Sequence, residues 1–440
     1  MKTKIYLIIT AVILFGLCEI QAIEYYIVDI GTIESDPESK AFGINDHRQV
    51  VGYSGMVQGP EAGRRAFLWD NGIMFNLGTL GGNHSEAYGI NNSGQVVGRS
   101  TLASGEGDVR GFLWEKDSMI NLGTLQGGWT EAHGINNASQ VVGYSVLLSS
   151  VKAFLWENGS MANLGSLGDN SHGYANNDSG QIAGYCFGWG ACLWQNGTIT
   201  SLGTLGGNNS YAWDINNYGQ IVGSSSTGGV VSYTHAFLWE NGTMTDLGTL
   251  GGNWSEAYGI NDAGQIVGRS DGYAFLWENG TMTDLNELLP SDSGWILLEA
   301  TAINNMGQIV GSGYIDDKLH AFFMTPVIYV EIDIKPTTLN LTSTSRWITC
   351  RIWLPEDYNV TDVNTATVYL EHQAQPEWIW FNQKQNLLMT KFNRSEIQNI
   401  LEPAREVELT VSGYLLDGTY FLGTDTIKVI NKGRKVNFQR

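Results

Sequence analysis

A unit of about 40–45 residues recurs seven times between residues 25 and 326, and this repeat constrains the fold more than any single motif. The clearest copy contains Leu-Gly-Thr-Leu-Gly-Gly at 247–252, Ala-Tyr-Gly-Ile-Asn at 257–261, Gln-Ile-Val-Gly at 265–268 and Ala-Phe-Leu-Trp at 274–277. The register is marked by a Gln with an Asn four residues before it, at Gln49, Gln95, Gln140, Gln181, Gln220, Gln265 and Gln308.

Each unit contains four runs that read as short β-strands. The third run, such as Ala236-Phe237-Leu238-Trp239, is apolar on both faces and is therefore expected to be covered on both sides. Asn-Gly dipeptides, which favour a tight hairpin because both residues tolerate positive φ, separate the third and fourth runs at 71–72, 158–159, 196–197, 241–242 and 279–280. Four strands in a unit of this length, with both sheet faces buried, are typical of a propeller blade.

The two ends of the repeat are out of phase with the blades. Residues 26–33 match a fourth strand with its crossover, whereas the last unit ends after its third strand at 321–324. We therefore predict an all-β fold with a seven-bladed β-propeller in which the N-terminal strand closes the last blade. An open solenoid is the alternative, and the half-unit missing at each end favours the closed ring, which leaves no open sheet edge.

The repeat resembles the HAF family of extracellular repeat proteins, named for a His-Ala-Phe triplet. The triplet is literal at 235–237 and 320–322, and its first residue varies elsewhere, as at 65–67 and 152–154. The resemblance covers the repeat region and implies secretion or surface display. It carries no agreed catalytic residues.

The N-terminus has the features of an export signal. Residues 1–4 are basic, residues 5–17 are apolar over a length too short to span a bilayer, and residues 20–22 fit a cleavage site. We predict a signal peptide over 1–22, a propeller over 23–327, and no transmembrane segment once the signal is removed. The many Asn-x-Ser/Thr sequons agree with a glycoprotein, although a chain rich in Asn, Ser and Thr also produces them by chance.

Residues 328–440 follow a different pattern, with alternating apolar residues and a helix expected near 395–401. This pattern predicts a C-terminal antiparallel β-sandwich. The segment is similar to a C-terminal module of secreted archaeal and bacterial proteins, but Thr337 stands where that module has Gly and Asn393 where it has Asp. The similarity implies a role as a spacer or attachment module.

The charge balance excludes one class of partner. The chain has 24 Lys and Arg against 44 Asp and Glu, a net charge of −20. Because phosphate binding needs a concentrated basic surface, we expect no nucleic-acid partner.

Three sets of residues are candidates for a site. Glu86, Glu131, Glu256 and Glu299 precede the first strand of four units and would share one face of a ring, either as ligands of a structural cation such as Ca²⁺ or as solvated loop charges. Trp129, Trp213 and Trp254 lie near the crossover and the first strand and would form an aromatic ligand-binding platform. Cys186 and Cys192 flank a short loop and are placed for a cross-hairpin disulfide in an oxidising compartment, which leaves Cys350 unpaired.

No catalytic constellation is found, because the seven His are scattered singly and the acidic residues repeat with the scaffold. We therefore expect a secreted or cell-surface binding module with a glycan or protein ligand, without enzymatic activity and without a cofactor. A propeller-fold polysaccharide hydrolase or lyase and a structural component of the cell envelope are the alternatives. The loops expected to determine recognition, where the seven copies differ, are 53–65, 100–110, 145–152 and 224–235.

Overall fold

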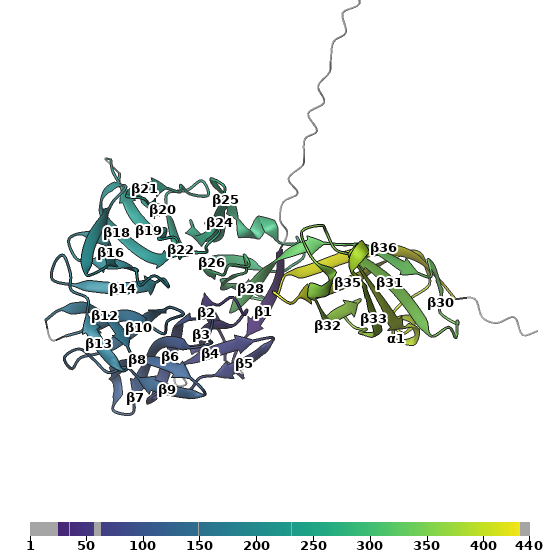
Figure 1. The fold of residues 1–440 in the computed structure, drawn as a ribbon, viewed down its shortest axis with the longest axis horizontal. Helices are drawn as coiled ribbons and strands as arrows, with labels where there is room; N and C mark the ends of the chain where they lie inside the picture. Colours follow the sequence, from purple (N-terminus) through teal and green to yellow (C-terminus); the bar gives the residue numbers. More distant parts are fainter. Residues whose placement is uncertain (1–24, 35, 57–62, 148, 230, 432–440) are drawn as a thin grey trace, which may run out of the picture.

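The computed structural model describes residues 25–34, 36–56, 63–147, 149–229 and 231–431. The predicted signal peptide therefore lies outside the described residues. The fold is all-β, with 62% strand and 4% helix. Figure 1 shows the sheets of the repeat region fanned around a common centre, with the C-terminal part beside them.

The repeat region contains six sheets of four antiparallel strands in the part of the chain that the structure describes. In chain order, these sheets are β2 (Ser39–Ile44), β3 (Val50–Met56), β4 (Gly63–Asp70) and β5 (Ile73–Asn76); β6 (Gly81–Ile90), β7 (Val96–Leu102), β8 (Gly105–Glu115) and β9 (Ser118–Asn121); β10 (Thr130–Ile135), β11 (Val141–Val146), β12 (Val151–Glu157) and β13 (Ser160–Asn163); β14 (Ser171–Asn176), β15 (Ile182–Cys186), β16 (Gly190–Gln195) and β17 (Thr198–Gly203); β18 (Gly206–Ile215), β19 (Ile221–Thr227), β20 (Thr234–Glu240) and β21 (Thr243–Asp246); and β22 (Ser255–Ile260), β23 (Ile266–Ser270), β24 (Tyr273–Glu278) and β25 (Thr281–Asp284).

The last unit supplies only three strands, β26 (Ile296–Ile303), β27 (Ile309–Ile315) and β28 (Lys318–Tyr329). The N-terminal strand β1 (Tyr25–Gly31) pairs antiparallel with β28, with Val28 opposite Phe323. The sequence predicted this pairing from the unmatched half-units. A 3-10 helix, η1 (Leu285–Leu288), connects β25 to the last unit.

The turns and the third strands have the geometry that the repeated residues predict. At the Asn-Gly hairpins both residues have positive φ, for example 48° at Asn71 and 85° at Gly72, as the turn prediction required. In the third strands the Phe side chains are fully buried at Phe67, Phe112, Phe154, Phe237, Phe275 and Phe322. These rings pack in clusters that join neighbouring sheets, so the apolar faces of the third strand hold one sheet to the next.

The repeated Asn and Gln form a continuous hydrogen-bonded circuit. Each Asn donates from Nδ2 to Oε1 of the Gln four residues later and to the backbone oxygen of the equivalent Asn in the next unit. The inter-unit bonds, each 3.0 Å long, run from Asn45 to Asn91, Asn136, Asn177, Asn216, Asn261, Asn304 and back to Asn45. The Asn-x-x-x-Gln spacing is thus a structural motif whose bonds return to their starting residue.

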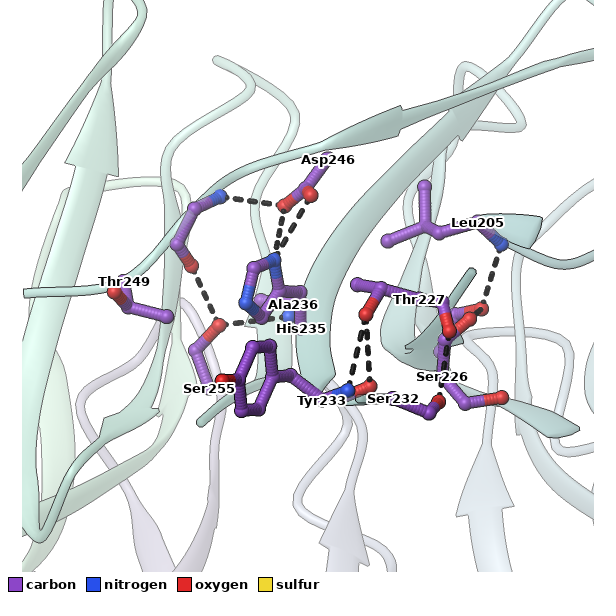
Figure 2. Close-up of polar contacts among 12 residues, drawn as sticks. Leu205, Ser226, Thr227, Ser232, Tyr233, His235, Ala236, Asp246, Thr249 and Ser255 are labelled. Carbon is purple, nitrogen blue, oxygen red and sulfur yellow. Dashed lines mark hydrogen bonds and ion pairs between the residues drawn. The ribbon is translucent and has the colours of Figure 1, made fainter. Parts of the chain in front are cut away.

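A second repeated contact joins the third strand of one sheet to the first strand of the next (Figure 2). Ala236 donates its backbone N–H to Oγ of Ser255, and that hydroxyl donates to the backbone oxygen of Gly248. Asp246 accepts from the backbone N–H of Gly248 and contacts Nδ1 of His235 at 2.8 Å. Asp29 and Asp284 accept equivalent backbone bonds, so each of these aspartates stabilises a turn.

The C-terminal part contains two sheets around one apolar core. Its elements are β29 (Glu331–Lys335), β30 (Thr338–Asn340), β31 (Trp347–Trp353), η2 (Val360–Asp362), β32 (Val363–Leu370), β33 (Pro376–Asn382), η3 (Gln383–Gln385), β34 (Leu387–Asn393), α1 (Arg394–Gln398), β35 (Ala404–Leu415) and β36 (Tyr420–Ile430). One sheet has the order β29-β31-β34-β33, and the other contains β36, β35 and β32. The core cluster draws on both, so the part is a β-sandwich.

The predicted purely antiparallel pairing of this sandwich is wrong in two places, because β36 pairs in parallel with β28 and with β30. Strand β28 crosses the predicted boundary at 327–328 and continues the last repeat sheet into the sandwich. Three side-chain contacts reinforce the junction. Tyr26 stacks on Tyr420 at 4.3 Å, the Arg48 guanidinium lies 4.5 Å from the Tyr414 ring centroid, and Gln308 donates to the backbone oxygen of Gly418.

Two of the four predicted recognition loops are largely strand. Residues 100–110 contain the end of β7 and the start of β8, and residues 53–65 include the paired ends of β3 and β4. Residues 57–62, 148 and 230, within three of the predicted loops, lie outside the described residues. The second and third strands extend by pairing beyond the repeated motif, so these insertions lengthen hairpins.

Candidate functional site: an aromatic cavity

The first strands of seven sheets meet around one cavity of about 360 Å³, here called the aromatic cavity. Its lining residues are Phe42, Tyr88, His133, Tyr174, Trp213, Tyr258, Glu299 and Thr301. Except for Glu299, they occupy the same repeat position, directly after the small residue that opens the Ala-Tyr-Gly-Ile-Asn motif. One repeat position therefore supplies a residue from each first strand.

Small residues on either side of this position allow the close approach of the strands. Ala87 is fully buried, and a Cβ at Gly89 would lie 2.7 Å from the backbone oxygen of His133 in the neighbouring sheet. A register shift between Ala87 and Gly89 interrupts the pairing with β7 at Tyr88. The same shift recurs at the equivalent point of the other sheets. The bulge frees the residue between the small ones to project from the strand.

The rings form a continuous arc along one side of the aromatic cavity. Phe42 lies 5.5 Å from Tyr88, which stacks on His133 at 4.8 Å; His133 meets Tyr174 edge-on at 5.5 Å, and Tyr174 lies 4.7 Å from Trp213. Each ring is partly exposed. Aromatic pairs at such separations hold one another in place, so the arc is a preformed apolar surface.

A second tier of rings extends the arc over three neighbouring sheets. Tyr144 lies 4.6 Å from His172, Tyr185 lies 4.6 Å from Tyr211, and Tyr211 stacks at 5.5 Å on Trp213. Burial lowers the pKa of His172, and the nearby His133 lowers it further, so the neutral imidazole is favoured. The second tier therefore extends the aromatic surface.

An ionic network lies directly against the rings, since Glu86 accepts from the Tyr88 hydroxyl and Glu131 lies 3.5 Å from His133, and it corrects the expected placement of the four glutamates. Glu86, Glu131, Glu256 and Glu299 do not precede the first strands as solvated loop charges; they lie within β6, β10, β22 and β26. Glu86 and Glu131 are buried, with 2% and 4% of their surface exposed. The alternation of the strand explains this, because each Glu is two residues before the cavity position and shares its face.

Cations and hydroxyls satisfy these carboxylates. Arg99 bridges two sheets, with its guanidinium 3.1 Å from Glu86 and 2.8 Å from Glu131. Glu86 also pairs with Arg64 and accepts from the Tyr88 hydroxyl at 2.6 Å.

The two remaining carboxylates are satisfied in the same manner. Glu299 pairs with Lys40 at 2.7 Å and accepts from Ser312. Glu256 accepts from the Tyr258 hydroxyl at 2.7 Å. These pairings favour a structural ionic collar over a cation site.

The electrostatics agree with this assignment. Burial alone raises the pKa of Glu131, but His133 and Arg99 outweigh it and hold that pKa at about 2. The same balance, with His84 and Arg99 as the leading partners, places the pKa of Glu86 well below its usual range. Within the described residues, no group of three or more His, Cys, Asp or Glu is arranged to hold a metal ion.

The structure separates the three predicted tryptophans. Trp213 lines the aromatic cavity and donates from Nε1 to the Ser224 hydroxyl at 3.3 Å. Trp129, 37% exposed, meets Tyr144 edge-on at 6.5 Å, and Trp254 lies under the Arg269 guanidinium at 5.3 Å; neither lines the cavity. The three therefore do not form the predicted common platform.

Sequence reasoning missed the other cavity residues, Phe42, Tyr88, His133, Tyr174 and Tyr258. Their signal was the second position of the Ala-x-Gly-Ile-Asn motif, where Phe, Tyr, His, Trp and Thr replace one another while the flanking positions vary less.

The cysteines remain free thiols in the structure. Cys186 faces Gly190 and Cys192 faces Gly184, so the two lie diagonally across the β15–β16 hairpin. Their side chains hydrogen-bond to each other, which lowers the pKa of Cys186. Their disulfide remains a prediction. Cys350 is fully buried in the sandwich core.

The opposite end of the first strands is polar. A cavity of about 200 Å³ there is lined by the Ile-Asn-Asn/Asp segments of the seven units. Asp46, Asp178 and Asp262 each accept from Asn side chains of adjacent units, at 2.9, 2.9 and 3.1 Å in the closest pairs. This end is therefore engaged in holding the units together, whereas the aromatic end has exposed rings.

Comparisons with known proteins establish no family. No protein-family model matches the chain, and no curated protein matches it. Among solved structures, the extracellular domain of a proposed one-component system from B. thetaiotaomicron aligns over 90% of this chain and 54% of that structure, with 10% identity and a TM-score of 0.45. Dipeptidyl peptidase 4 from Porphyromonas gingivalis aligns over 68% of this chain and 55% of its own, with 10% identity and a TM-score of 0.32.

A puromycin-hydrolyzing peptidase from Mycobacterium tuberculosis aligns over 70% of this chain and 53% of its own, with 10% identity and a TM-score of 0.35. The chain thus spans about half the length of each of these structures. At these similarities, the functions of those proteins do not transfer to this chain. Among the described residues, no helix is both long and apolar enough to cross a membrane.

Proposed function

We propose that this chain is an exported, non-enzymatic binding module that takes a carbohydrate ligand at the aromatic cavity of a closed seven-bladed propeller. The observation that carries the proposal is the combination, at one cavity, of an arc of five rings with an ionic collar directly beside it. Sugars are amphipathic in the same way, since one face of a pyranose ring presents C–H groups and its rim presents hydroxyls.

Ring closure supports the proposal because it would hold the arc rigid. The inter-unit Asn bonds return to Asn45, and β1 pairs with β28. A preformed site loses less conformational entropy when a ligand binds. Resemblance to extracellular repeat proteins and the predicted signal peptide over 1–22 favour export, which would place the aromatic cavity among extracellular glycans.

The pairing of the acidic groups at this site with cations favours binding over catalysis. The buried carboxylates of the described collar are committed to Arg99, Arg64 and Lys40, and their lowered pKa values keep them ionised. A general acid for glycoside cleavage needs the opposite, a carboxyl that stays protonated near neutral pH.

The test is calorimetric titration of the full chain with a panel of soluble neutral and acidic oligosaccharides. For any ligand that binds, Trp213→Ala should weaken the affinity about tenfold, roughly 1.4 kcal/mol. Trp254→Ala is the matched control, because it removes the same side chain outside the aromatic cavity. Equal losses in the two variants, or release of reducing ends during the titration, would contradict the proposal.

A further inference from the structure

The four-stranded sheet of the C-terminal sandwich has a second aromatic surface, independent of the aromatic cavity. Along β31 the residues alternate between buried and partly exposed, with Ile348, Cys350 and Ile352 in the core. The outward positions of β31 and β33 include Trp347, Trp353, Trp378 and Trp380, here called the tryptophan face. Ile379, between the last two, packs on the core.

We propose that the tryptophan face binds an extended polysaccharide bearing carboxylate groups. Sugar rings would stack on Trp378 and Trp380, and Lys391 would meet a carboxylate. Trp378 and Trp380 are 42% and 45% exposed although they lie within an ordered strand. Residues two apart on one strand face lie roughly 7 Å apart, so the two indoles form a row along the edge of the sheet. Large exposed aromatic groups gathered on one face are typical of binding surfaces.

The positive charges beside the tryptophan face favour an anionic ligand. Lys391 lies directly opposite Trp378 on the neighbouring strand, with its Nζ 4.9 Å from the indole centroid. Arg346 lies 4.3 Å over the Trp347 ring. The ion pairs found among the described residues include Arg346 with Glu377 and Arg351 with Asp333, but none from Lys391. The ammonium of Lys391 is thus a cation beside the exposed rings that a ligand carboxylate would complement.

The overall charge distribution agrees with an anionic ligand at this part of the chain. Of the 24 Lys and Arg, 12 follow residue 327, together with 13 of the 44 Asp and Glu. The C-terminal part is therefore nearly neutral, and the repeat region carries almost all of the acidic excess. Repulsion from that region is screened beyond about 8 Å at physiological ionic strength.

A polysaccharide fits this face better than a membrane surface does. The indoles lie on the flat face of the sheet. The carboxylates of Asp333, on β29, and of Glu377, on β33, lie on the same face or at its edge. Insertion of the indoles into a membrane interface would also remove those carboxylates from water, which is costly. A sugar chain lying along β33 would instead find both rings to stack on and polar groups to bond.

The test is the retardation of the full chain in native gels containing polygalacturonate, with hydroxyethyl cellulose as the neutral polymer. We expect retardation by polygalacturonate, at least roughly tenfold weaker in the Trp378→Ala/Trp380→Ala double variant. Lys391→Met keeps the aliphatic part of the side chain. This variant should weaken the retardation by polygalacturonate about threefold and make it depend less on salt. Trp254→Ala, which alters neither the tryptophan face nor the aromatic cavity, should leave retardation unchanged, and calorimetry of Trp213→Ala tests the aromatic cavity separately, so failure of this site and failure of the aromatic cavity are distinguishable.

Several outcomes would overturn the inference. These are unchanged retardation of the double variant, an equal affinity for hydroxyethyl cellulose, or binding to phosphatidylserine vesicles without binding to polygalacturonate. Concentration-dependent dimerisation abolished in the double variant would show that the face pairs with a second copy instead. Thermal unfolding of each variant controls for folding, and substitutions of such exposed side chains should leave it nearly unchanged.

Discussion

Replacing one asparagine of the hydrogen-bonded circuit should destabilise the whole repeat region. Asn136 is 4% exposed, and its side chain makes four hydrogen bonds. Its Nδ2 donates to Gln140 Oε1 at 2.8 Å and to the Asn177 backbone oxygen at 3.0 Å, and its Oδ1 accepts from the backbone of Ala138 at 3.1 Å and Gln140 at 2.9 Å. At about 1 kcal/mol per bond, Asn136→Ala should lower the free energy of unfolding by about 4 kcal/mol.

Urea denaturation followed by tryptophan fluorescence measures this loss. Asn253→Ala is the matched control, because Asn253 is exposed and its side chain makes no hydrogen bond to the described residues, so this change should cost about 1 kcal/mol or less. Asn304→Ala tests closure, since its Nδ2 bond crosses from the last unit to Asn45. In a closed ring it should cost as much as Asn136→Ala. A loss under about 1 kcal/mol for Asn136→Ala, or a nearly silent Asn304→Ala, would refute the reasoning.

Further predictions concern charge and thiols. Arg99→Ala should cost about 3 kcal/mol at neutral pH by leaving buried carboxylates unpaired. The pKa of Glu131 is held at about 2, so the ionised Glu131 stabilises the folded chain above the ordinary pKa of a glutamate. This contribution to the free energy of unfolding is lost as pH falls toward 2. The melting curves of the variant and of the natural chain should therefore converge in acid. Burial raises the pKa of Asp214 to about 7 from 3.8, so its protonated form is favoured and stability falls as pH rises between these values. Asp214→Ala should therefore gain relative stability of up to about 4 kcal/mol between pH 4 and pH 8, and equal melting shifts at both would contradict this. Oxidation should join Cys186 to Cys192, seen by intact mass as the loss of two hydrogens, and a Cys192→Ser variant should not lose them.

Much of the repeat architecture could be predicted because its signals are local. Asn-Gly fixes a hairpin through positive φ at Asn71 and Gly72, and an apolar third strand must be covered on both faces. The pairing of β1 with β28 followed from counting strands. The repeat region begins with an unmatched fourth strand and ends with a unit that lacks one, so the two ends are expected to pair.

The candidate site was harder to predict because it depends on side-chain direction between sheets. Glu86 was expected in a loop, and only the start of β6 at Gly81 shows that it faces Arg99 from within a strand. Trp213 was singled out and lines the cavity, but its partners were not singled out, because their identity changes from unit to unit. Two of the insertions expected to be loops, at 53–65 and 100–110, contain the paired ends of hairpin strands, because backbone pairing there satisfies more hydrogen bonds.

The sequence by itself determined the unit: its four strands, its turns, the Asn-x-x-x-Gln spacing and the apolar faces that must be covered. Only the tertiary structure decided what the units build together. The variable position of each first strand forms a site only when the seven first strands converge. Residues about 40–45 positions apart in the sequence then line one cavity. The tryptophan face arises in the same way, since alternation turns four indoles outward while the core holds the sheet that carries them.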